Sequence, residues 1–85
     1  MTREEVELGC RQIVADQLAI PETEIEDESK MLALGADSLD NVEMIMQVEE
    51  KFNVHFSDED AEKITNFEDL VDMTLKLIGE GGGQK

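Results

Sequence analysis

Apolar residues recur at three- and four-residue spacing along most of this chain, which is the spacing of amphipathic helices. A first helix is predicted after Thr2 and Glu5, which fit a capping box, and Pro21 prevents it from continuing. One face of this helix carries Val6, Cys10, Ile13, Val14, Gln17 and Leu18. Residues 19–36 then form a long connection, which is expected to pack onto the helices through the apolar anchors Ile20, Ile25, Met31, Leu32 and Leu34.

Two further helices, one long and one short, are predicted after this connection. Asp37 or Ser38 can cap the long helix, which is predicted to end near Phe52. A similar capping pattern begins at Ser57. It predicts a short helical segment that ends near Ile64.

A last helix is predicted from a further capping box at Thr65 and Glu68, with one apolar face made of Phe67, Leu70, Val71, Thr74 and Ile78. Gly79 is well placed to end it, and residues 79–85 are expected to form a disordered Gly-rich tail. No segment shows sustained period-two alternation, so no strand is predicted. The predicted fold class is all-α, a small antiparallel bundle of three main helices plus one short helix, in a single domain over residues 1–78.

The second helix carries more apolar surface than a core needs. Its apolar residues sweep roughly 220° of the helical wheel, against the 100° or somewhat more of an ordinary core-facing helix. They are Leu39, Val42, Met44, Ile45, Met46, Val48 and Phe52. We expect Ile45, Val48 and Phe52 to face the core, with Val42 at the boundary. Leu39 and Met46 lie beside an acidic stripe, and they are either partly exposed, as a strip for a transient partner, or covered by the long loop.

The charge of the chain restricts the kinds of partner that it can bind. Its 85 residues include 22 Asp and Glu against 7 Lys and Arg, for a net charge of −15. Such a surface repels nucleic acid and anionic lipid, and it attracts proteins with basic patches. No apolar run is long enough to span a membrane, and the first residues lack the apolar core of a signal peptide. We therefore expect a cytoplasmic protein, or one of an organellar matrix if a transit peptide has been removed.

Ser38 is the candidate site of chemistry, although most serines at helix starts act only as caps. A catalytic serine needs a general base within hydrogen-bond reach. His55, the only histidine, lies beyond the far end of the same helix, at least about 20 Å away by helical rise. The nucleophile-elbow pattern G-x-S-x-G is also absent from the sequence. The sequence therefore argues against a serine hydrolase, and we predict that the protein is not an enzyme.

Acyl carrier proteins have a signature that resembles three segments of this chain: Leu34-Gly35-Ala36-Asp37-Ser38-Leu39-Asp40, Val42-Glu43 and Glu49-Glu50-Lys51-Phe52. Residues 58–65 resemble the third-helix segment of that family, at the expected separation. The resemblance covers roughly residues 3–78. Asp-Ser-Leu alone is a weak motif, but the combined segments, in register with the predicted helices, are specific.

The resemblance implies a carrier whose 4'-phosphopantetheine arm is attached to Ser38 by a separate transferase, with Asp37 assisting. The arm would carry acyl chains as thioesters and deliver them to fatty-acid-synthesis enzymes with basic docking patches. The docking face would be made of Leu39, Asp40, Val42, Glu43, Met46, Gln47 and Glu50. The acyl chain would be sheltered by Val42, Met44, Ile45, Val48, Phe56, Ile64, Leu70 and Val71. By this reading the protein is a monomer without a metal site, and Cys10 is a core residue.

Three other functions remain as alternatives. A polyketide, peptidyl or D-alanyl carrier would share the same signature, although the high acidity and Asp40 resemble fatty-acid-synthesis carriers more closely. An acidic calcium-binding module is disfavoured, because neither residues 22–28 nor residues 57–62 have the ligand spacing of an EF-hand loop. An adaptor without a covalent group would keep its function when Ser38 is replaced, whereas a carrier would lose it.

Overall fold

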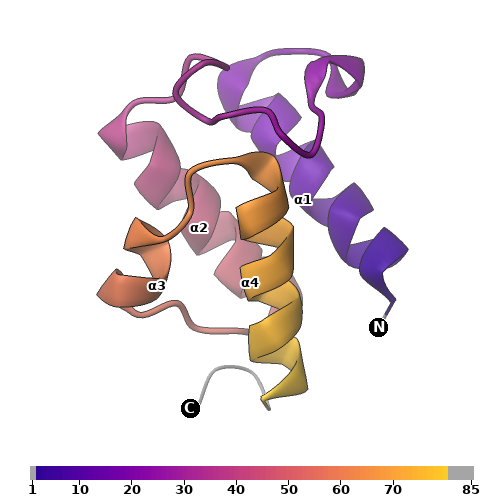
Figure 1. Cartoon of the computed structure of the whole chain (residues 1–85), viewed down its shortest axis with the longest axis vertical. Coiled ribbons are helices and arrows are strands. Elements are labelled where there is room, and N and C mark those ends of the chain that lie inside the picture. Colours follow the sequence, from indigo (N-terminus) through magenta and orange to yellow (C-terminus); the bar gives the residue numbers. More distant parts are fainter. Residues whose placement is uncertain (1, 81–85) are drawn as a thin grey trace.

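Helices make up most of the chain in a computed structural model that describes residues 2–80 (Figure 1). No strand occurs within that range, although Lys30 and Asn66 form an isolated antiparallel bridge. The predicted all-α class is therefore confirmed. None of the helices in these residues is long and apolar enough to cross a membrane. In chain order the elements are α1 (Arg3–Leu18), the 3₁₀ turn η1 (Glu22–Glu24), α2 (Ser38–Phe52), α3 (Asp58–Glu62) and α4 (Phe67–Gly79).

A capping box begins each of the four α-helices. In each box, the side chain of the cap residue accepts a hydrogen bond from the backbone N–H of the residue three positions later. The carboxylate of that later residue accepts a hydrogen bond from the backbone N–H of the cap residue. The pairs are Thr2–Glu5, Asp37–Asp40, Ser57–Asp60 and Asn66–Asp69. The box predicted at Thr65 and Glu68 is therefore wrong by one residue. Asn66 is the cap because Asp69 stands three residues beyond it, and the Thr65 hydroxyl donates to the same carboxylate (2.9 Å).

The ends of the helices differ in how they are made. Ala19 and Asn53, with φ of 57° and 56°, adopt the left-handed conformation that ends α1 and α2. Gly79 was predicted to end α4, but it is the last helical residue and Glu80 follows as the cap. The disordered tail was predicted to begin at residue 79, which is wrong for Gly79 because it is helical; residues 81–85 lie outside the described residues.

The three main helices share one bundle, in which α1 packs against both α2 and α4. Figure 1 shows that α1 runs antiparallel to the other two, as predicted. The helices α2 and α4 run in the same direction, because the connection through α3 returns the chain to the end of the bundle where α2 begins. The loop of residues 19–36 crosses that same end (top of Figure 1). The start of α2 therefore lies where the long loop closes the bundle.

The long loop packs onto the helices through some of its predicted anchors. Ile25 and Met31 are buried, with exposed fractions of 3% and 4%. Leu32 was expected to be another anchor, but its side chain is 81% exposed. The Met31 N–H donates to the Thr65 carbonyl (3.0 Å), which holds Met31 against the core, and the turn that follows directs Leu32 outward. This contact fixes the loop that leads into α2.

Candidate functional site

Ser38 is the first residue of α2, and its side chain is exposed. Asp37 is the N-cap, since its Oδ1 accepts from the Asp40 N–H (2.9 Å) and the Asp40 Oδ2 accepts from the Asp37 N–H (3.2 Å). The sequence left open which of Asp37 and Ser38 caps the helix, and the structure assigns that role to Asp37. The Ser38 hydroxyl is therefore not needed to complete the start of the helix.

The chain approaches Ser38 through a tight turn. Gly35 has a φ of 102°, a backbone conformation that residues other than glycine rarely adopt. The next residue, Ala36, is only 3% exposed, and its N–H donates to the Met31 carbonyl (3.0 Å). Because Ala36 is anchored in the core, the two residues after it emerge at the surface in a defined position.

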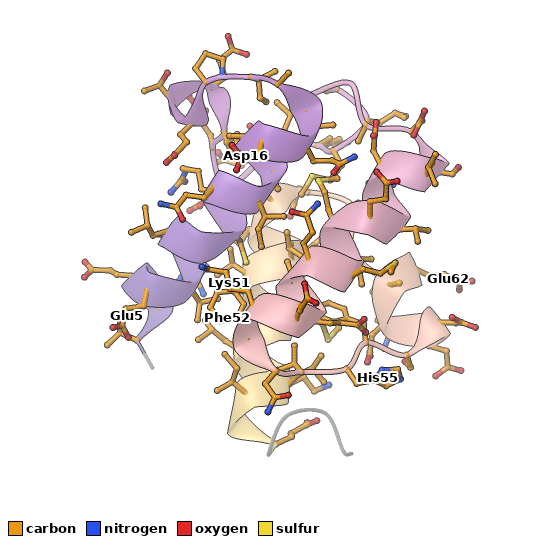
Figure 2. The ribbon with its side chains drawn as sticks, turned by 180° about the vertical axis from the view of Figure 1, so that it is seen from behind. Glu5, Asp16, Lys51, Phe52, His55 and Glu62 are labelled. Atoms are coloured by element: carbon orange, nitrogen blue, oxygen red, sulfur yellow. The ribbon has the colours of Figure 1, made fainter. Side chains whose placement is uncertain are left out.

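The only histidine of the chain is too distant to activate Ser38. His55 lies beyond the C-terminal end of α2, opposite the end where Ser38 stands (Figure 2). Its Nδ1 is 3.4 Å from the Glu49 Oε2, which also accepts from the Phe56 N–H (2.7 Å). A serine hydroxyl without a general base is a weak nucleophile. No histidine therefore activates the Ser38 hydroxyl in this structure.

An apolar stripe is exposed along α2 after Ser38. Leu39, Val42 and Met46 follow each other at helical spacing and are 64%, 53% and 59% exposed. The prediction that Leu39 and Met46 are exposed is confirmed, and the alternative that the long loop covers them is wrong. Val42 was placed at the core boundary, but it belongs to this exposed stripe. The core contacts of α2 come from Met44 and Val48, which are buried, and from Ile45 and Phe52, which are partly buried.

Acidic side chains border the apolar stripe, and a residue of α1 holds two of them. The Gln17 Nε2 donates to the Asp40 Oδ1 (3.1 Å) and to the Glu43 Oε1 (2.6 Å). The Gln47 Nε2 donates in turn to the Gln17 Oε1 (3.0 Å). The Gln17 amide, together with the capping contacts of Asp37, lowers the pKa of Asp40 below its ordinary value. Gln17, Glu43 and Gln47 line an open depression on the surface together with Met46, Glu49 and Glu50.

Sequence reasoning missed this role of Gln17, which it placed on the apolar face of the first helix. The sequence feature that could have indicated this role is a polar residue near the end of an otherwise apolar helix face. Pattern alone does not show what such a residue contacts, because its partners lie more than twenty positions further along the chain. Gln17 is in fact partly buried at the contact between α1 and α2.

A small cavity of about 30 Å³ lies between α2, α3, α4 and the long loop. Four of the residues predicted to shelter an acyl chain line it: Met44, Ile45, Ile64 and Leu70. The other lining residues are Met31, Asn41 and Ala61. The other four predicted residues are not among its lining: Val48, Phe56 and Val71 are buried, and Val42 is exposed. A cavity of this size holds about one water molecule, so an acyl chain would enter only if the surrounding elements moved apart.

The acidic residues do not form a cation site in the described part of the chain. Across residues 2–80, no three His, Cys, Asp or Glu side chains lie in an arrangement that could hold a metal ion. Several acidic side chains act as helix caps or capping partners instead, such as Asp37 and Asp60.

Two comparisons with known proteins agree with this geometry. The family described as the phosphopantetheine attachment site matches residues 11–74, which include Ser38 and all of α2. Among solved structures, the chain is similar to the crystal structure of an acyl carrier protein from Thermotoga maritima. The two are 28% identical in sequence, the match covers 94% of each chain, and the TM-score is 0.81.

Proposed function

Because this chain belongs to the acyl carrier protein family, we propose that Ser38 bears its phosphopantetheine arm and that the protein carries acyl chains for fatty-acid synthesis. Proteins of this family are carriers and not enzymes, and their 4'-phosphopantetheine is covalently bound. When bound, the arm supplies a terminal thiol to which acyl groups are joined as thioesters. The observation that carries the proposal is the exposed Ser38 hydroxyl at the start of α2, beside Asp37 and free of a capping role.

The surroundings of Ser38 fit a long, hydrophilic arm. Ser38, Leu39 and Asn41 are exposed, so a group bonded to the Ser38 Oγ can extend into solvent without displacing a core residue. A Cβ added to Gly35 would meet no atom within 4 Å, which shows that the turn before the site is open. Asp37 lies next to Ser38 and keeps its carboxylate at the surface, where it can assist the transferase that attaches the arm.

The α2 surface supports docking of the enzymes that such a carrier serves. Carriers of this kind interact with a phosphopantetheinyl transferase and with synthesis enzymes. We propose that these proteins contact the exposed apolar stripe and its acidic border, made of Leu39, Asp40, Val42, Glu43, Met46, Gln47 and Glu50. Between Lys30 and Lys51 the sequence has no basic residue, so all the charged side chains of this surface are acidic. A partner with a basic rim and an apolar centre complements it, and opposite charges accelerate the encounter.

The loaded acyl chain would occupy an enlarged form of the small cavity. Met44, Ile45, Ile64 and Leu70 already surround this space, and Met31 closes it from the loop. Methionine side chains are flexible, so they can move aside as a chain enters. A wider open cleft adjoins the cavity and shares Met31, Asn41 and Ile64 with it. These three side chains therefore separate the cavity from the surface, and a chain could enter where they move aside.

The choice of fatty-acid synthesis over D-alanyl transfer is tested by the acyl group with which the arm can be loaded. The arm-bearing protein is incubated in parallel with malonyl-coenzyme A and the malonyl transferase of a fatty acid synthase, and with D-alanine, ATP and a D-alanyl carrier ligase. Intact-mass spectrometry should show a malonyl adduct in the first reaction and none in the second. The arm-free protein is the control and should remain unloaded. D-alanyl loading without malonyl loading would contradict the proposed pathway, while leaving the carrier role intact.

A further inference from the structure

We propose that Gln17 of α1 is a positioning residue of the docking surface, whose amide holds the Asp40 and Glu43 carboxylates in the arrangement that a cationic partner binds. The proposal rests on the carrier function proposed above. It extends the docking surface from α2 onto α1. It also assigns a role to a side chain that takes no part in the covalent bond between Ser38 and the arm.

The geometry uses every hydrogen-bonding group of the Gln17 side chain. A primary amide has two N–H donors and one carbonyl acceptor. The Nε2 lies 3.1 Å from the Asp40 Oδ1 and 2.6 Å from the Glu43 Oε1, and the Oε1 accepts from the Gln47 Nε2 at 3.0 Å. Three side chains of α2 therefore converge on one side chain of α1. Such a network restricts the rotamers of all four residues.

The two carboxylates would repel each other without this amide. Asp40 and Glu43 are three residues apart on α2, a separation that places them on the same face of the helix. A neutral donor between them relieves the repulsion and keeps both negative charges. A lysine or arginine in its place would also hold them, but it would cancel the charge that attracts basic partners. An amide is therefore suited to organise an acidic docking surface.

The arrangement leaves room for a partner to bind. An ionised carboxylate offers about four acceptor positions; Gln17 uses one on each, and the Asp37 N–H uses a second on Asp40. The remaining positions on Asp40 and Glu43 can accept from a guanidinium or ammonium group of the partner. Because the carboxylates are already ordered, less conformational entropy is lost when the partner binds.

The test measures how well Gln17 variants serve as acceptors for a phosphopantetheinyl transferase with coenzyme A and Mg²⁺. Gln17→Met keeps the length of the side chain and removes its hydrogen-bonding groups. The control is Gln12→Ala, which truncates an exposed glutamine of α1 that makes none of these three hydrogen bonds. We expect the KM of the transferase for the Gln17→Met carrier to rise roughly two- to tenfold, with kcat unchanged. This is the loss of affinity expected when one or two hydrogen bonds are removed. An unchanged or lower KM, with the fold verified by circular dichroism, would overturn the proposal.

A second readout separates positioning from direct contact with the transferase. The carboxyl carbon of Asp40 is titrated by NMR in the parent, Gln17→Met and Gln12→Ala proteins without any partner. The pKa of Asp40 should rise toward its ordinary value in Gln17→Met alone, because the Gln17 hydrogen bond is the main cause of its lowering. A higher KM without this rise would show that Gln17 contacts the partner directly and would refute positioning. If the parent itself were not modified, the proposed carrier function would fail instead.

Discussion

Ser38 and Ser57 stand at the starts of two helices, but their hydroxyls have different tasks. The Ser57 Oγ accepts from the Asp60 N–H (3.0 Å) and completes a capping box. At the start of α2 the preceding residue, Asp37, makes that contact, so the Ser38 hydroxyl remains available for modification. The sequence pointed to Ser38 through its motif. It did not distinguish the two capping possibilities, because aspartate and serine are nearly equal as N-caps.

Cys10 illustrates the opposite case, a reactive residue type made inert by its surroundings. Its side chain is fully buried, and burial raises the pKa of the thiol to about 11. At pH 8 only roughly one thiol in a thousand would then be ionised, and the thiolate is the reactive form. We expect Cys10 in the arm-free protein to react with Ellman's reagent only after guanidinium is added. Rapid reaction of the native protein would contradict this, and the exposed thiol of the attached arm provides a positive control.

At the scale of elements, the helix starts could be predicted well and the exposed faces less well. Capping residues act on neighbours three positions away, so local sequence is enough to locate them, apart from the one-residue error at Asn66. The exposure of Val42 depends on which element covers that side of α2, and that is a tertiary property. The same reason explains why Leu32 and the contacts of Gln17 could not be predicted.

The crossing of α1 and α2 depends on a residue without a side chain. A Cβ at Gly9 would lie 2.6 Å from the Phe52 Cζ and 2.8 Å from the Lys51 Cε, and Figure 2 shows Lys51 and Phe52 at the end of α2 beside α1. Gly9→Ala should therefore destabilise the fold by about 1 kcal/mol, since overpacking outweighs the gain in helix propensity.

Chemical denaturation measures this effect, and Gly79→Ala is the matched control. A Cβ at Gly79 would meet no atom within 4 Å, so that variant should be neutral or slightly stabilised. If Gly9→Ala were as stable as the Gly79 variant, the predicted overpacking would be wrong, and the Phe52 and Lys51 side chains would have to move aside at little cost.

At the scale of the whole molecule, the net charge of −15 opposes the compact state. Few cations offset it, and the most connected of these is Arg3, which lies within 4 Å of carboxylates of Glu7, Glu68 and Asp72. The sequence predicted the repulsion, because charge is counted directly from composition. It did not predict that Arg3 links the start of α1 to α4, since this contact joins residues far apart in the chain.

Added salt should raise the melting temperature of the protein, because counterions screen the repulsion between carboxylates. Differential scanning calorimetry at rising NaCl concentration measures the shift, and Mg²⁺ should act at lower concentrations because it is divalent. A variant with Glu22→Gln and Glu24→Gln removes two exposed charges of the long loop. It should begin at a higher midpoint and gain less from salt. A midpoint independent of salt would show that self-repulsion does not limit stability.

The central claim is that Ser38 bears the phosphopantetheine arm, and intact-mass spectrometry tests it most directly. The arm-free parent, Ser38→Ala and Ser57→Ala are each incubated with coenzyme A, Mg²⁺ and a broad-specificity phosphopantetheinyl transferase. Ser57→Ala is the matched control, because it also removes an exposed serine at a helix start. We predict the mass gain of a single arm in the parent and in Ser57→Ala, and no gain in Ser38→Ala. A gain in Ser38→Ala, or none in the folded parent, would contradict the account.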